Sequence, residues 1–230
     1  MVIGDRQNLL IDADDTLWEN NIYFERVIHR TIGLLEKTGA DSSRFREVLD
    51  ETERNRIPLN GYGTVNFTHS LVEAFRKFLP PGSDPSLPAQ VEQMSLAILD
   101  RPLELMEGVP ETLAYLSGRH SLFLVTKGDP AEQSRKIRAS NLEGYFKAAE
   151  ILAEKNAQAY ARLMTRHKWE PSRTWMIGNS PRSDINPALA AGLSAVYIPH
   201  VHTWTLEHED PADHPNLVKL EKFSDLRHHF

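Results

Sequence analysis

The order of apolar and amphipathic segments in this chain predicts an α/β fold, a parallel sheet interrupted by one large helical insertion. The apolar run at residues 9–11 lacks polar alternation, which is typical of a buried strand. Residues 20–100 then carry helical patterns only. After Gly108 short apolar runs alternate with helical segments, which is the order of a parallel sheet covered by helices on both faces.

The strands and helices after Gly108 each have their own signal. Apolar runs predict buried strands at 122–125, 175–177 and 195–198. Helical segments are expected near 109–117, 130–140, 156–167 and 185–191. Because these helices lie between successive strands, parallel pairing follows. Residues 200–230 are rich in His and charge, and they give only a weak signal.

The insertion contains four apolar stripes at helical spacing. We expect the first helix to end at Gly39, the second to stop before Pro58 and the third to stop at the Pro-Pro-Gly of residues 80–82. The stripes are Phe24, Val27, Ile28, Thr31 and Leu35; Phe45, Val48, Leu49 and Thr52; Phe67, Leu71, Phe75 and Phe78; and Val91, Met94 and Ile98. Two domains are predicted: a Rossmann-like parallel sheet core of residues 1–18 and 105–230, and an all-helical domain of residues 19–104.

Composition excludes several classes of protein. The formal net charge is -6, from 26 basic and 32 acidic residues, which disfavours a nucleic-acid-binding surface. The chain has no cysteine, so disulfides, thiol nucleophiles and Cys-based zinc sites are excluded. No apolar stretch approaches the ~20 residues of a membrane span, and residues 1–6 lack the apolar core of a signal peptide. We expect a cytoplasmic monomer or homodimer that binds neither membrane nor nucleic acid.

Chemically useful side chains follow three of the predicted strands. Asp12, Asp14 and Thr16 come after the first strand, and Thr126 and Lys127 come at the end of the second. The loop after the strand at 175–177 runs from Gly178 through Asn179 to Asp184. In a parallel sheet the loops at the carboxyl ends of the strands lie on one edge, where ligands bind. Clustered carboxylates are costly there unless a cation or a reaction partner compensates them, so the pattern predicts a metal site, a nucleophile or both.

With these residues the chain resembles the haloacid dehalogenase superfamily, in its phosphatase branch. The Asp-x-Asp-x-Thr motif of that family after a strand matches Asp12, Asp14 and Thr16. The Thr or Ser that ends an apolar strand matches Thr126, and the Lys at the start of a helix matches Lys155. The final Gly-Asp with a further Asp matches Gly178 and Asp184, but Asn179 stands where Asp is usual.

The resemblance implies a Mg²⁺-dependent phosphatase. Asp12 would attack phosphorus to form an aspartyl-phosphate, and Asp14 would act as general acid and then as general base. Thr126 and Lys155 would hold the phosphoryl oxygens. Mg²⁺ would be bound by Asp12, Asp184 and the Asp14 backbone carbonyl, with Asn179 in the same metal loop.

The resemblance also implies that the helical insertion is a mobile cap. We expect hinges near residues 17–20 and 103–108, and closure over a small phosphorylated metabolite. Arg54, Asn55 and Tyr62 are predicted cap contacts to substrate, since Gly61-Tyr62-Gly63 lies between two cap helices. In the core we assign Thr16 and Lys127 to substrate binding as well.

Two other functions stay open. A 2-haloacid dehalogenase uses the same Asp nucleophile without a metal; Asn179 slightly favours this class, whereas Asp14 and Thr16 favour the phosphatase form. A catalytically weak phospho-ligand-binding protein is the third possibility, with a metal site weakened by Asn179.

Each motif also has a purely structural interpretation. The segment 12–15 could be a turn or a helix N-cap, Thr126 could simply end a strand, and Lys155 could be a surface lysine. Asp184 could be the N-cap of the helix that follows. His200 and His202 would share a strand face, either on the surface or at the mouth of the site.

Overall fold

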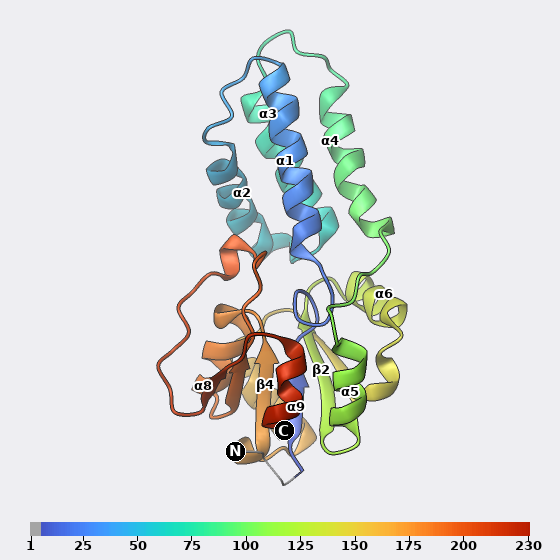
Figure 1. Cartoon of the computed structure of the whole chain (residues 1–230). Helices are drawn as coiled ribbons and strands as arrows, with labels where there is room; N and C mark the ends of the chain where they lie inside the picture. Colours follow the sequence, from blue (N-terminus) through green and yellow to red (C-terminus); the bar gives the residue numbers. More distant parts are fainter. Residues whose placement is uncertain (1–5) are drawn as a thin grey trace. The chain divides into compact units, whose positions relative to one another are not determined.

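A computed structural model of the chain describes residues 6–230 (Figure 1). It divides into two compact units: the described residues up to Glu19 together with Leu103–Phe230, and residues Asn20–Pro102. The first unit contains every strand of the described residues, and the regular elements of the second are all helices. No helix in the described part of the chain is long and apolar enough to cross a membrane.

The first unit is built on a six-stranded sheet in the order β3-β2-β1-β4-β5-β6, and every pairing is parallel. Its strands are β1 (Asn8–Ile11), β2 (Ser121–Lys127), β3 (Ala148–Leu152), β4 (Thr174–Gly178), β5 (Ser194–Tyr197) and β6 (Leu217–Lys219). Central β1 is paired with β2 and β4, with Ile11 in register with Leu124 and Ile177. The carboxyl ends of these three strands are therefore neighbours, and the predicted α/β fold with a Rossmann-like parallel core is confirmed.

Helices cover both faces of the sheet. Because successive residues of a strand point to opposite sides, neighbouring residues of β1 belong to different cores. Leu9 and Ile11 pack into one core with α5 (Val109–Ser117), α6 (Pro130–Ser140) and α9 (Leu226–His229). Leu10 faces the other core, with α7 (Ala157–His167) and α8 (Asn186–Ala190). Leu9, Leu10 and Ile11 are fully buried, as their continuous apolar run predicts.

The connections of the first unit also contain short helical turns. They are the 3₁₀ turns η2 (Glu143–Tyr145), η3 (Pro171–Arg173), η5 (Thr205–Glu207) and η6 (Phe223–Asp225), and the π-helical turn η4 (Pro181–Ile185). Strands β3 and β6 were not predicted from the sequence. They lie at the two ends of the strand order and are only partly buried, so neither needs an uninterrupted apolar run.

The second unit consists of α1 (Asn21–Lys37), α2 (Phe45–Asn60), α3 (Thr64–Phe78), α4 (Leu87–Leu96) and the 3₁₀ turn η1 (Ala97–Asp100). Its core is formed by the predicted stripes, including Phe45, Phe67, Leu71 and Phe75. The expected stop before Pro58 is wrong, because α2 continues to Asn60. Pro58 lies in the last turn, so the helix loses only the bond that an N–H at this position would donate to the Arg54 carbonyl, and Gly61 at φ 75° ends the helix instead.

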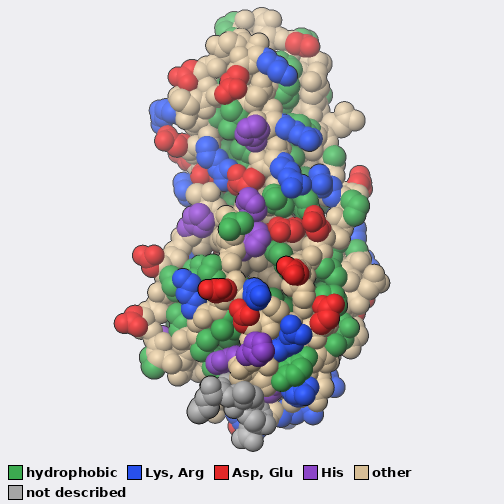
Figure 2. All heavy atoms as spheres, in the orientation of Figure 1, with side chains coloured by type: hydrophobic (Ala, Val, Ile, Leu, Met, Phe, Trp, Pro, Cys, Tyr) green, Lys and Arg blue, Asp and Glu red, His purple; other side chains and the backbone are tan. Residues whose placement is uncertain are grey.

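Both signs of charge are interspersed over the face shown in Figure 2, with acidic and basic side chains on neighbouring parts of each unit. A mixed surface of this kind gives no extended field of one sign for a polyanion.

Candidate active site

Asp12 lies directly after β1, at the edge where three strands end. Its backbone N–H donates to the Ile177 carbonyl at 2.9 Å, which continues the β1–β4 ladder by one bond. The side chain is buried. Thr16 Oγ1 lies 3.0 Å from Asp12 Oδ2 and 3.3 Å from Asn179 Oδ1, so one hydroxyl links the loop after β1 to the loop after β4.

Lys155 joins the two buried carboxylates of the site. Its Nζ donates to Asp12 Oδ1 and, at 2.7 Å, to Asp184 Oδ1. Its side chain is 2% exposed, so this lysine is a residue of the site interior. Asn156 caps α7 by accepting the Ala159 N–H at 2.9 Å, and this fixes the start of the helix that follows Lys155.

The charges in this cluster do not cancel. Burial and the neighbouring Asp184 raise the pKa of Asp12 to about 7, although Lys155 opposes the shift. Burial disfavours the ammonium, but Asp12 and Asp184 together raise the pKa of Lys155. One ammonium therefore faces two carboxylates in a site that water hardly reaches, and an excess of negative charge remains.

The loop after β4 presents Asp184 from the π-helical turn η4. Asp184 Oδ2 accepts the Ser180 backbone N–H at 3.0 Å, and the Asp184 N–H donates to the Ser180 carbonyl at 2.8 Å. A Cβ at Gly178 would collide with the Asp184 carboxylate, so only glycine fits there. The N-cap interpretation of Asp184 is wrong. Asp184 lies inside η4, which is capped by Ser180, whose Oγ accepts the Ser183 N–H at 3.0 Å, and α8 has no side-chain cap.

Asp14 has a different environment from Asp12. Trp18 Nε1 donates to it at 2.6 Å, Gln133 Nε2 at 2.8 Å and Lys136 Nζ at 2.9 Å. Burial opposes its charge, but Lys136 and the two other donors hold the pKa of Asp14 below its usual value. Sequence reasoning missed Gln133 and Lys136. Their spacing of three residues places them on one face of the helix that follows Thr126, but no local pattern connects that face with Asp14.

The end of β2 supplies Thr126 and Lys127. Thr126 is buried, and its Oγ1 lies 3.4 Å from Gln133 Oε1. Lys127 Nζ donates to Ser183 Oγ at 2.8 Å and to Glu207 Oε1 at 2.6 Å, and Glu154 lies 3.4 Å away. Sequence reasoning also missed Glu207, which lies in the part of the chain with the weakest pattern. The ammonium of Lys127 is thus already bound within the protein.

A second group of possible metal ligands lies in the same unit. One ligand atom each of Asp15, Glu19 and His200 lie within 4.8 Å of one another. His200 Nε2 is 3.4 Å from Glu19 Oε2, and its Nδ1 is 3.7 Å from Asp15 Oδ1. Burial lowers the pKa of His200, although Glu19 opposes that shift. His200 therefore faces two acids, and the His200 and His202 rings are 5.7 Å apart.

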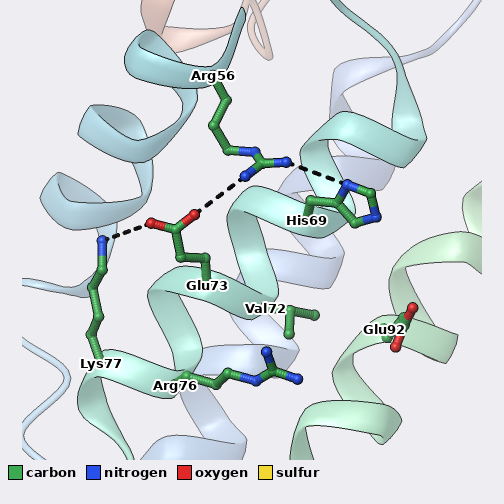
Figure 3. Close-up of a pocket in the computed structure, with 7 residues that line it drawn as sticks. All are labelled: Arg56, His69, Val72, Glu73, Arg76, Lys77 and Glu92. Atoms are coloured by element: carbon green, nitrogen blue, oxygen red, sulfur yellow. Dashed lines mark hydrogen bonds and ion pairs between the residues drawn. The ribbon is translucent and has the colours of Figure 1, made fainter. Parts of the chain in front are cut away.

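The predicted substrate contacts of the insertion belong to the helical unit. Arg54 and Asn55 are exposed on α2, and Tyr62 is half-buried in the turn between α2 and α3. A polar groove in this unit runs along α3, as Figure 3 shows. Within it, Glu73 accepts from Arg56 at 3.4 Å and pairs with Lys77 at 3.1 Å. The groove is lined by Arg56, His69, Val72, Glu73, Arg76, Lys77 and Glu92. The predicted contact residues are not among these.

The core residues predicted from three separate loops thus meet at one edge of the sheet. Asp12, Asp184 and Asn179 offer oxygen atoms, which are the ligands that Mg²⁺ prefers. The raised pKa of Asp12 is the mark of a carboxylate with too little positive charge around it. A divalent cation would correct that imbalance, so the donor set and the charge both fit Mg²⁺.

Comparison with protein families gives one match that spans most of the chain. Residues 7–192 match the model of the haloacid dehalogenase-like hydrolases. None of the curated proteins compared with the chain matches it.

Several solved structures share the fold over nearly the whole chain. A haloacid dehalogenase-like family hydrolase from Xanthomonas campestris is 29% identical, with a TM-score of 0.85 over 97% of this chain and 89% of that one. The putative hydrolase YfnB from Bacillus subtilis, solved bound to magnesium, is 17% identical, with a TM-score of 0.65 over 97% and 98% of the two chains. A 2-haloacid dehalogenase from Pseudomonas syringae is 20% identical, with a TM-score of 0.59 over 97% of each chain.

Proposed function

We propose, from the premise that this chain belongs to the haloacid dehalogenase-like hydrolases, that it is a Mg²⁺-dependent phosphatase of a small phosphorylated metabolite. The observation that carries the proposal is the pair of carboxylates after β1. Asp12 and Asp184 both accept from the Lys155 ammonium, which is the environment expected of a carboxylate nucleophile. Asp14 adds a second carboxylate, which a reaction with an alkoxide leaving group requires.

Asp12 is the nucleophile in this mechanism. One of its carboxylate oxygens attacks phosphorus, the bond from phosphorus to the ester oxygen breaks, and an aspartyl-phosphate forms. Thr16, 3.0 Å from Asp12 Oδ2, orients the carboxylate. Lys155 and Thr126 hold the phosphoryl oxygens, so that charge developing on them meets fixed donors.

Asp14 transfers the protons. In the first step it gives a proton to the departing oxygen, which leaves as an alcohol. In the second step the Asp14 carboxylate takes a proton from water, whose oxygen attacks phosphorus and releases Asp12 and inorganic phosphate. Because three donors hold Asp14 as a carboxylate, it must gain a proton before the first step. Movement of Lys136 away from Asp14 on substrate binding would raise the pKa of Asp14, which would then take its first proton from solvent. In later turnovers Asp14 gives the proton that it took from water in the preceding one.

The metal ion would be held by Asp12, Asp184 and the Asp14 backbone carbonyl, with Asn179 as a neutral oxygen donor. When bound it neutralises charge on the substrate phosphate and on Asp12. The proposed cap contacts, Arg54, Asn55 and Tyr62, would meet the leaving group from the helical unit.

The test is turnover of a panel of phosphate monoesters, with Mg²⁺ or with EDTA. We expect release of inorganic phosphate that requires Mg²⁺ and is lost in Asp12→Asn. Absence of phosphate release from every monoester in the presence of Mg²⁺ would refute the proposal.

A 2-haloacid dehalogenase is the second candidate, supported by Asn179 and by the fold shared with the Pseudomonas syringae enzyme. In that reaction Asp12 would displace halide from carbon, and no acid would be needed for the leaving group. Halide release from 2-chloropropionate in EDTA, retained in Asp14→Asn, would favour this candidate. Phosphate release that requires Mg²⁺ and Asp14 favours the phosphatase.

A further inference from the structure

Glu207 is a buried acid that the proposed mechanism does not use. It lies in the short turn η5 (Thr205–Glu207) and is 8% exposed. Its carboxylate accepts from Lys127 Nζ at 2.6 Å, from Ser180 Oγ at 2.5 Å and from Ser183 Oγ. Three donors on one buried carboxylate form a fully connected network, and such networks rigidify their surroundings.

The partners of Glu207 are direct neighbours of the site residues. Lys127 follows Thr126 at the end of β2. Ser180 uses its backbone N–H to bind the Asp184 carboxylate at 3.0 Å, while its hydroxyl binds Glu207. Lys127 also donates to Ser183 Oγ at 2.8 Å, which closes the network between the two strand ends.

Other bonds attach the same segment to the loop after β4. Asn179 Nδ2 donates to Thr203 Oγ1 at 3.1 Å, and Arg182 donates to the Leu206 carbonyl at 3.0 Å. Residues 203–207 therefore contact this loop on both sides of Ser180. Among residues 203–207, only Glu207 has a charged side chain.

We propose that Glu207 is a positioning residue. By binding Lys127, Ser180 and Ser183, it fixes the position of Thr126 relative to Asp184. It touches none of the reacting groups, and its effect on turnover rests on the proposed phosphatase function. Mutation of a residue that hydrogen-bonds and orients the metal ligands commonly lowers metal affinity or activity by ~10- to 100-fold. Misplacement of reacting groups affects turnover more than substrate binding.

The experiment compares Glu207→Gln with Glu209→Gln. Glu209 is a matched control on the same segment, exposed and bonded to Asn186 at 2.9 Å. We expect Glu207→Gln to lower kcat about 10-fold, to weaken Mg²⁺ binding in calorimetry by a similar factor, and to change KM less than threefold. Glu209→Gln should leave all three within twofold. Assays well below the melting temperature of each variant exclude loss of folded enzyme as the cause.

Lys127→Met supplies the coupling test. If the two side chains act as one unit, the double variant should lose little more kcat than Lys127→Met alone. Equal, additive losses, or a Glu207→Gln enzyme within twofold of wild type in kcat and Mg²⁺ affinity, would overturn the proposal.

A readout without turnover separates this proposal from the function. The side-chain ammonium of Lys127 should give a protected NMR signal that is lost or strongly shifted in Glu207→Gln and unchanged in Glu209→Gln. An inactive wild type with that pattern would refute the phosphatase and leave the positioning contact supported. An unchanged Lys127 signal in Glu207→Gln would refute the positioning role whatever the activity.

Discussion

Two sides of the loop after β1 hold identical side chains in opposite electrostatic states. On one side Asp12 shares a single ammonium with Asp184, and burial raises its pKa to about 7. On the other side Asp14 accepts from Lys136, which also lies 3.7 Å from Glu132, and from two neutral donors, Trp18 and Gln133. Despite burial, these partners lower the pKa of Asp14. The two aspartates are only two residues apart, so the difference comes from their partners and not from their place in the chain.

This difference indicates a division of roles. A site with excess negative charge attracts a cation and the groups that react beside it. A carboxylate with several donors of its own is held in place and stays ionised until a donor leaves. In the proposed mechanism Asp12 would react beside a metal ion, and Lys136 keeps Asp14 ionised until substrate binds.

The largest expected effect is on turnover in Asp12→Asn. An amide cannot form the acyl-phosphate, so phosphatase activity should fall by at least ~10³-fold. Steady-state phosphate release measures the loss, and circular dichroism checks the fold. Activity near the wild-type level would remove Asp12 from the nucleophile's role.

Asp14→Asn should lower turnover less than Asp12→Asn does. Loss of a general acid and base typically lowers the rate by ~10²- to 10⁴-fold, and the penalty should shrink for esters with good leaving groups such as p-nitrophenol. The ratio of kcat values for an alkyl and an aryl phosphate measures this. A loss of the same size for both esters would contradict proton transfer by Asp14.

Metal affinity should separate the two residues of the loop after β4. Asp184→Ala deletes a charge beside Lys155 and Asp12, so Mg²⁺ binding should weaken more than ~10-fold, whereas Asn179→Ala should weaken it much less. Asn179→Asp should tighten binding or leave it unchanged. Calorimetric titration of the three variants decides the point. Wild-type affinity in Asp184→Ala would mean that this loop does not bind the metal.

Stability should change in opposite directions in the two Asn variants. Because the pKa of Asp12 is raised to about 7 in the native state without metal, the unfolded chain releases this proton first. The native state therefore loses stability as the pH rises from about 4 to about 7, and the full loss remains above pH 7. In EDTA at pH 8, Asp12→Asn should therefore raise the free energy of unfolding by about 1–2 kcal/mol, and this gain should vanish as the pH falls toward 4.

Asp14→Asn should lower the free energy of unfolding, the opposite of Asp12→Asn. Its lowered pKa means that the ionised form stabilises the native state above the usual aspartate pKa, and that this stability is lost on acidification. Asp14→Asn should lower the free energy of unfolding by about 1.5–3 kcal/mol at pH 8, the typical contribution of a hydrogen bond to a charged group. Urea unfolding of both variants, with exposed Asp213→Asn as control, measures the two signs. Equal signs would contradict the comparison.

Much of the core could be predicted from the sequence. The uninterrupted apolar runs before Asp12 and before Gly178 identify central strands, and parallel pairing then brings their loops to one edge. Edge strand β3 has no such run, because none of its residues is fully buried and Ala149 is exposed. Helix α2 passed Pro58 because a proline in the last turn breaks few bonds.

The partners of the site residues were harder to predict. Lys155 follows from a motif, but Lys136 and Glu207 are ordinary charged residues until folding brings them to Asp14 and Lys127. Their contacts span more than 75 residues of sequence, and no local pattern encodes such a distance. The electrostatic difference between Asp12 and Asp14 depends on Asp184 and Lys136, which are distant in sequence, so it emerges only in the structure.

The most direct test is a pH titration of the aspartate side-chain carboxyl signals by carbon-13 NMR, without divalent metal. Assignments come from Asp12→Asn and Asp14→Asn. The account predicts that Asp12 titrates near pH 7 and Asp14 below the usual aspartate range. Added Mg²⁺ should move Asp12 to lower pH, because the bound cation favours the charged form. Two aspartates that titrate together near pH 4, with or without Mg²⁺, would contradict the account.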